Sequence, residues 1–332
     1  MKMQIALEEV FCEIGLMVKD QHVVLLIDRG LLDGSAYVSK ENWQALLDDT
    51  NLNMVMLRDA RYDAVLHMVT AADGAEDFYA SLNNEARYES VSEAVDKDTK
   101  LREAYMGHQK YYLIDNNCQD FNTKINRTKG NVHEILGLKR GTQFYRKFLL
   151  KKSSQNALLQ TILPIQLGDS NCEESQVIET FIRYQSSEGK VLSSSIEKKG
   201  SNKCFTYTHK IQYEKQGQKI LKKRSISAAE YIELEQTRDS DMKTLVATRI
   251  CTIDQGIYQI MDYYPQVDGQ PVVCIIQINE NEHQAEGDKR IKLPNYLKIA
   301  RDITDLDEFQ PDSLAHKDYK MSDEDKLATK AD

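Results

Sequence analysis

The chain has 332 residues, of which 41% are hydrophobic and 29% charged, and its formal net charge is −9. The length predicts two domains, and the acidic balance argues against nucleic-acid binding. No apolar run approaches the roughly 20 residues of a membrane-spanning helix. The six cysteines include no C-x-x-C pair, which argues against a zinc site and favours a reducing, cytoplasmic compartment.

The first half of the chain alternates between helical and strand-like segments. Its strands are expected at 23–27, 62–69 and 110–114, and its helices at 4–11, 39–49, 83–107 and 121–137. Such alternation predicts a parallel sheet with crossover helices, where ligands bind at the carboxyl ends of strands. Asp28, Thr70 and Asp115 follow the three strands. An acidic residue at the end of a strand is typical of Mg²⁺-nucleotide sites, but it is equally typical of helix caps. The phosphate-loop motif G-x-x-x-x-G-K-[ST], which would decide for a nucleotide site, is absent from the sequence.

The second half is rich in strands separated by turn residues. Strands are expected at 143–151, 177–184, 190–196, 203–213, 219–226, 244–252, 256–263 and 272–278. One helix is expected at 227–237, opened by a capping box at Ser227. Eight such strands predict a closed or nearly closed antiparallel barrel. Charge is uneven, since residues 198–224 carry a net +8 and residues 302–332 a net −6.

Five sequence blocks, in order, resemble the family of the TRPL translocation defect protein. They are IDRGLLDGSAY at 27–37, HMVTAADGAEDFY at 67–79, NEARYES at 84–90, GH at 107–108 and IDN at 114–116. The resemblance implies an incomplete P-loop-kinase-like domain at 1–138, of the AAA or NadR-kinase type. A CYTH-like triphosphate-tunnel barrel at 139–310 and an acidic tail at 311–332 would follow. The fold class expected is thus α/β followed by α+β.

The resemblance also implies vestigial nucleotide-binding positions. Asp28 and Arg29 match the family's metal and phosphate positions, Arg87 matches a lid arginine, and Asp115 lies at a predicted strand end. In the family, the phosphate loop precedes the segment that corresponds to the first residues of this chain. We therefore expect no cofactor, and an Mg-nucleotide only where an upstream phosphate loop exists.

Within the implied barrel, Lys147, Lys199, Lys210, Arg249 and Asp262 match the anion-binding positions. Glutamine at Gln277 and serines at 193–195 stand where the family has glutamate and arginine, and Glu197 also replaces an arginine. The resemblance therefore implies that the acidic set is lost, with no metal site and no catalytic residue. The surviving cations either line a lumen or form a solvated outer face, and both interpretations stay open.

The expected function is a non-catalytic binding or structural component of a larger protein assembly. One alternative is a GTP- or ATP-binding enzyme or switch whose N-terminus is missing. Another is a module that binds phosphoinositide headgroups, polyphosphate or acidic peptide tails through its cationic barrel. The family resemblance implies a ciliary or microtubule-associated setting.

Overall fold

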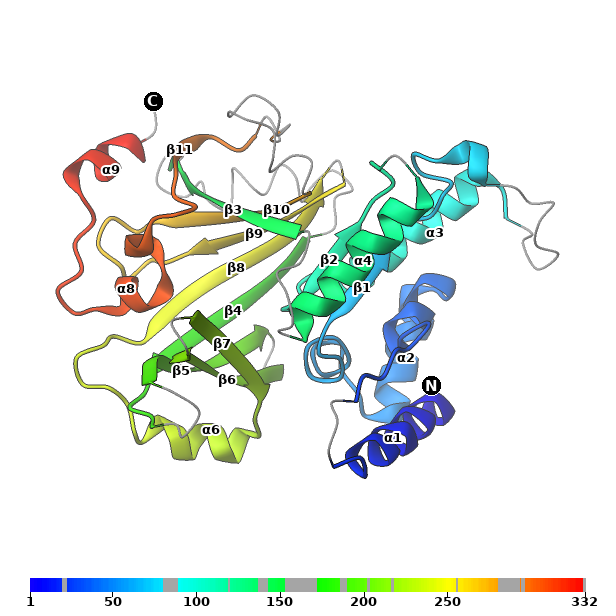
Figure 1. The fold of residues 1–332 in the computed structure, drawn as a ribbon, viewed down its shortest axis with the longest axis horizontal. Helices are drawn as coiled ribbons and strands as arrows, with labels where there is room; N and C mark the ends of the chain where they lie inside the picture. The colour runs from blue at the N-terminus through cyan, green and yellow to red at the C-terminus, as the bar shows by residue number, and fades with distance from the viewer. Residues whose placement is uncertain are drawn as a thin grey trace.

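The computed structural model divides into a small α/β part and a large antiparallel sheet (Figure 1). It describes residues 1–19, 23–79, 89–118, 120–136, 143–152, 172–185, 190–201, 204–215, 218–254, 256–279, 293 and 296–330.

Two parallel strands form the sheet of the first part. Strand β1 (Val65–Met68) pairs with β2 (Tyr111–Ile114) along their whole length. The surrounding elements are α1 (Lys2–Leu16), η1 (Leu31–Tyr37), α2 (Lys40–Thr50), the π turn η2 (Met56–Ala60), η3 (Glu76–Phe78), α3 (Val91–Ala104) and α4 (Phe121–Ile135). The expected alternation of helix and strand is confirmed for both paired strands and for the helices at 39–49 and 121–137.

The strand expected at 23–27 is wrong. Residues 23–27 form no strand, and their backbone groups make no hydrogen bond within the described chain. An apolar run becomes a strand only when a neighbouring backbone pairs with it, and here none does. All five side chains are exposed, beside the exposed apolar side chains of α1.

The second sheet contains nine antiparallel strands in the order β11-β3-β10-β9-β8-β4-β5-β6-β7. Their bounds are β3 (Gln143–Leu150), β4 (Cys172–Phe181), β5 (Lys190–Ser201), β6 (Cys204–Lys215), β7 (Gln218–Ser225), β8 (Leu245–Asp254), β9 (Ile257–Tyr263), β10 (Val272–Asn279) and β11 (Ile299–Asp302). Helix α6 (Ala228–Glu235) follows β7 and is capped by Ser227, as expected.

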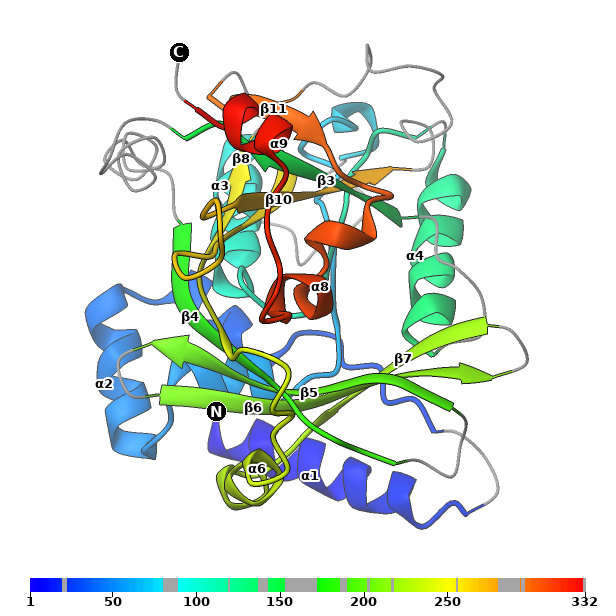
Figure 2. The same ribbon diagram turned by 90° about the vertical axis from the view of Figure 1, so that its left-hand side faces the viewer.

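The sheet is curved but not closed into the expected barrel (Figure 2). Within the described residues, β7 and β11 form opposite edges and do not pair. The missed strand β11 has only four residues and joins β3 through an irregular register, too short a segment for alternation to reveal.

The concave face of the sheet is covered at two places. At one end lie β2 and η2 of the first part, and at the other lie η5 (Asp307–Phe309) and α8 (Pro311–Ala315) (Figures 1 and 2). The C-terminal helix α9 (Asp323–Ala328) contacts β11. Apolar side chains form a separate core at each of the two covered places.

Candidate functional site

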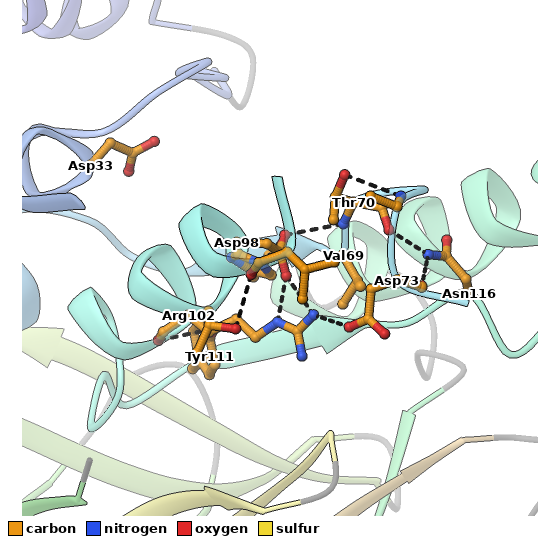
Figure 3. Close-up of polar contacts among 12 residues, drawn as sticks. Asp33, Val69, Thr70, Asp73, Asp98, Arg102, Tyr111 and Asn116 are labelled. Carbon is orange, nitrogen blue, oxygen red and sulfur yellow. Dashed lines mark hydrogen bonds and ion pairs between the residues drawn. The ribbon is translucent and has the colours of Figure 1, made fainter. Parts of the chain in front are cut away.

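The carboxyl ends of β1 and β2 carry a dense set of polar contacts (Figure 3). The carboxylate of Asp98, from α3, lies 3.1 Å from Nε2 of His67 and accepts hydrogen bonds from the Thr70 amide at 3.0 Å and Nε of Arg102 at 2.5 Å. Arg102 also donates to Asp73 at 2.5 Å. Burial by itself would raise the pKa of Asp98, but His67 and Arg102 hold it below its ordinary value.

Asn116, together with Lys124 and Arg127 of α4, completes this edge. The Asn116 amide donates to the carbonyls of Thr70 at 2.7 Å and Asp73 at 2.6 Å. Nζ of Lys124 donates to the carbonyl oxygen of Val69 and to Oδ1 of Asn116, both at 2.6 Å, and burial lowers its pKa. Hydrogen bonds therefore join the loops after both strands to each other and to α4.

The predicted nucleotide-binding residues are not brought together. Arg127 donates to Asp115 at 2.9 Å beside this edge, whereas Asp28 and Arg29 lie beside α1, where Gln4 donates to the carbonyl of Arg29 at 2.9 Å. Figure 3 shows Asp33, the residue paired with the Arg29 guanidinium at 3.5 Å, away from the Asp98 cluster. Arg87 lies outside the described residues.

The concave face of the large sheet carries a second polar cluster. Residues paired across antiparallel strands share a face, and pairs such as Glu179↔Glu197, Lys210↔Lys223 and Arg249↔Asp262 therefore point the same way. We call the concave site the set Glu179, Ser195, Glu197, Lys210, Lys223, Arg249 and Asp262.

The carboxylates of the concave site are bound by its cations. Nζ of Lys210 lies 2.6 Å from Glu197 and 3.2 Å from Glu179, which also accepts a hydrogen bond from the Ser195 hydroxyl at 2.6 Å. Burial alone would raise the pKa of Glu197, but the charges of Lys210 and Arg249 keep it low. The Arg249 guanidinium holds Asp262 through two hydrogen bonds of 2.6 and 2.7 Å.

Lys223 differs from its neighbours because it forms no ion pair with any described residue. Its side chain reaches solvent, yet it stands on a concave surface beside the charges of Lys210 and Arg249. Loss of hydration and these two cations lower its pKa to about 8. Among the three cations of the concave site, Lys223 is thus the one without a carboxylate partner in the described residues.

Lys147 and Lys199 lie at the two covered ends of the concave face. Nζ of Lys147 donates to Oε1 of Gln310 at 2.8 Å, next to α8, and burial lowers its pKa. Lys199 is 1% exposed and binds the carbonyl of Gly107 and, at 3.4 Å, the carboxylate of Asp59. Of the five expected anion-binding residues, the structure therefore places Lys210, Arg249 and Asp262 together, Lys147 at their border, and Lys199 against the first part.

Three carboxylates, those of Glu179, Glu197 and Asp262, nevertheless point into this face. The sequence interpretation treated Ser195 and Glu197 only as replacements of arginine, and it did not name Glu179 or Lys223 as site residues. Side chains alternate between the two faces of a strand, so the register of the neighbouring strands would have placed these residues on the same face as Lys210.

No three His, Cys, Asp or Glu side chains in the described part gather closely enough to hold a metal ion. Among the residues described, no helix has the length and apolar character needed to cross a membrane.

Residues 1–122 match the family model described as "AAA domain". No curated protein matches the sequence. Similar solved structures include the hypothetical protein NE1496, which has 12% identity and a TM-score of 0.35 and covers 52% of this chain and 97% of its own. The PH1819 protein from Pyrococcus horikoshii has 11% identity and a TM-score of 0.28, covering 41% and 77%.

A third similar structure is the putative adenylyl cyclase HpAC1 from Hippeastrum, whose title reports a dominant triphosphatase activity. It has 11% identity and a TM-score of 0.28, covering 42% of this chain and 81% of its own. Similarity at this level does not indicate what this chain binds.

Proposed function

We propose that the chain is a non-catalytic protein that binds a phosphate-bearing anion in its concave site. The observation that carries this proposal is Lys223, a cation without a carboxylate partner, on the same face as Lys210 and Arg249. Ammonium and guanidinium groups bind phosphate oxygens through charge-assisted hydrogen bonds. An anion placed at Lys223 would relieve the repulsion among the three cations.

The same contacts support binding without turnover. The oxygens of Glu179, Glu197 and Asp262 are already bound by Lys210 and Arg249. Carboxylates engaged in this way hold the cations in position and are poorly placed to activate a water molecule or to coordinate Mg²⁺. Incubation with Mg²⁺ and tripolyphosphate or ATP should release no phosphate above the level of a protein-free control. Steady release that is lost in Glu197→Gln would instead establish an enzyme.

Binding is tested by calorimetric titration of the full chain with a soluble phosphate monoester at low salt. We expect Lys223→Gln to weaken binding about tenfold or more, because it removes one charge-assisted contact. The matched control is Lys222→Gln, which removes the same charge from the neighbouring position, on the opposite face of β7. Equal binding by both variants would remove Lys223 from the site, and no binding by the unaltered chain would refute the proposal.

A second candidate function, nucleotide binding by the first part, is favoured by the match of residues 1–122 to the AAA-domain model. The hydrogen-bonded loops after β1 and β2 offer a place for it at the carboxyl edge of the sheet. A fluorescent ATP analogue with Mg²⁺ should bind saturably and more weakly to Asn116→Ala, while Asn117→Ala is the exposed neighbouring control. Absence of saturable binding would reject this candidate.

The five sequence blocks support two further proposals. The chain would belong to the family of the TRPL translocation defect protein, and it would take part in a larger ciliary or cytoskeletal assembly. Phosphoinositide headgroups would be a ligand class consistent with both. A native pull-down with the full chain tests the assembly: stoichiometric recovery of the same proteins would support it, and recovery of the chain alone would refute it.

A further inference from the structure

The first part of the chain closes one end of the concave face. The Tyr258 hydroxyl accepts a hydrogen bond from the Gly107 amide at 3.2 Å, and its ring stands edge-on to Tyr111 at 5.2 Å between centroids. The Gln277 side chain bonds to the backbone of β2, accepting from the Leu113 amide at 3.2 Å and donating to the Tyr111 carbonyl at 3.1 Å. Backbone and rings therefore fill the face beyond this point.

The C-terminal elements close the other end. Phe309 of η5 and Leu314 of α8 are 3% and 1% exposed and belong to one apolar cluster with Leu245, Val177 and Val273 of the sheet. In Figure 2, α8 lies between β3 and β10 on one side and β5 and β6 on the other. Folded chain thus occupies the concave face on both sides of the polar cluster.

Along β8, little length remains between these two closures. On β8, Arg249 is the inward-facing residue between Ala247 and Cys251, which belong to the two apolar clusters. These two residues are four positions apart, about 13 Å along a strand, and their own side chains fill part of that interval. A single layer of polar side chains is thus available to a ligand along this strand.

The concave site has no excess of positive charge. Its three cations, Lys210, Lys223 and Arg249, face its three carboxylates, Glu179, Glu197 and Asp262, so its net charge is zero, and Lys147 at its border lies near Asp307 and Asp312. A single phosphate group therefore brings less uncompensated charge into this environment than a chain of phosphates. A chain of several phosphates would bring uncompensated charge next to carboxylates that are already buried.

We infer that the concave site accepts one short phosphate group, orthophosphate or a terminal phosphate monoester, and that it discriminates against polyphosphate chains. This inference rests on the proposed function and narrows the ligand to one chemical class. Both the distance between the closures and the net charge of the interval lead to it. A free phosphate and the monoester of a lipid headgroup present the same chemistry to these residues.

The test compares four anions by calorimetry on the full chain at constant ionic strength: orthophosphate, glycerol 2-phosphate, tripolyphosphate and long-chain polyphosphate. We expect the affinity for the monoester to equal or exceed that for tripolyphosphate, and long-chain polyphosphate to gain nothing over tripolyphosphate. Affinity that rises tenfold or more from monoester to tripolyphosphate would overturn the inference while leaving anion binding intact. Failure of all four anions would instead refute the proposed function itself.

Two further arms sharpen the result. Glu197→Gln raises the net charge of the interval without removing an acceptor for Lys210, so it should improve tripolyphosphate binding relative to the monoester by several-fold. An unchanged ratio would contradict the charge argument. Vesicles containing a phosphoinositide monophosphate, compared with the soluble headgroup, distinguish the sources: tighter binding to the vesicle assigns the group to a lipid, and equal affinity assigns it to a soluble molecule.

Discussion

Lys210 and Lys223 are paired on neighbouring strands, and their surroundings act on them in opposite directions. Loss of hydration on the concave surface disfavours both ammonium groups, but the carboxylates of Glu179 and Glu197 raise the pKa of Lys210 above its ordinary value. Lys223, the more exposed of the two, forms no such ion pair, and the charge of Lys210 adds to the loss of hydration in lowering its pKa. The two ion pairs of Lys210 therefore separate a structural lysine from one that can exchange its proton near pH 8.

The low pKa of Lys223 predicts a pH dependence of anion binding. Protonated Lys223 attracts the anion, so affinity should be highest below pH 8 and should fall as the pH rises through about 8. Sulfate is a suitable probe for calorimetry because its own charge is constant over this range. Lys223→Gln should bind sulfate weakly, and its affinity should not change with pH over this range. An equally steep profile in that variant would place the titrating group elsewhere.

At this scale the sequence predicted the charges but not their partners. Lys210, Arg249 and Asp262 were identified from the family resemblance, and they do lie on one face. That Glu197 binds Lys210 depends on the register between β5 and β6, which shifts near Val191. A shift of one residue would send Glu197 to the opposite face, and alternation within one strand does not reveal it.

Among the elements, those with local start and stop signals were predictable. The hydroxyl of Ser39 accepts a hydrogen bond from the Asn42 amide at 3.2 Å and opens α2, as its position in the sequence indicates. The segment at 23–27 has no comparable local signal, because a strand is defined by hydrogen bonds to a partner. Its five apolar residues led us to expect a buried strand, but all five side chains are exposed in the described chain.

The cap of α2 can be tested directly. Ser39→Ala removes the side-chain acceptor for a free amide of the first turn and should lower the free energy of unfolding by about 1 kcal/mol. Ser39→Asp keeps an acceptor there and should restore most of the loss. Urea unfolding of the three proteins measures both effects. Equal loss in the two variants would show that the hydroxyl matters for another reason.

Across the whole molecule, a buried ionic network joins the two parts. Arg58 of η2 forms two hydrogen bonds with Asp59, at 3.1 and 2.8 Å, and pairs with Glu173 of β4 at 2.8 Å. Asp59 in turn lies 3.4 Å from Nζ of Lys199 on β5. Composition and local pattern predicted two parts but could not predict this contact, because it unites residues more than 100 positions apart.

Asp59→Asn should therefore destabilise the protein. Removing the carboxylate leaves buried Lys199 without an anionic partner and Arg58 with Glu173 alone, and we expect a loss of about 3 kcal/mol in the free energy of unfolding. Asp49→Asn breaks the exposed pair with Lys2 and serves as the control, with no measurable change expected. Denaturant unfolding followed by fluorescence gives both values. Coincident curves for the two variants would show that the buried network does not stabilise the fold.

The central claim is that an anion binds at Lys223, and the titration of this one side chain tests it most directly. With lysine side-chain carbons labelled for NMR, Lys223→Gln identifies the resonance of Lys223, which should titrate near pH 8 in the free protein. Saturating glycerol 2-phosphate should raise that midpoint, because the anion stabilises the protonated form. If the phosphate monoester binds and the midpoint of Lys223 does not move, the anion lies elsewhere and the claim is contradicted.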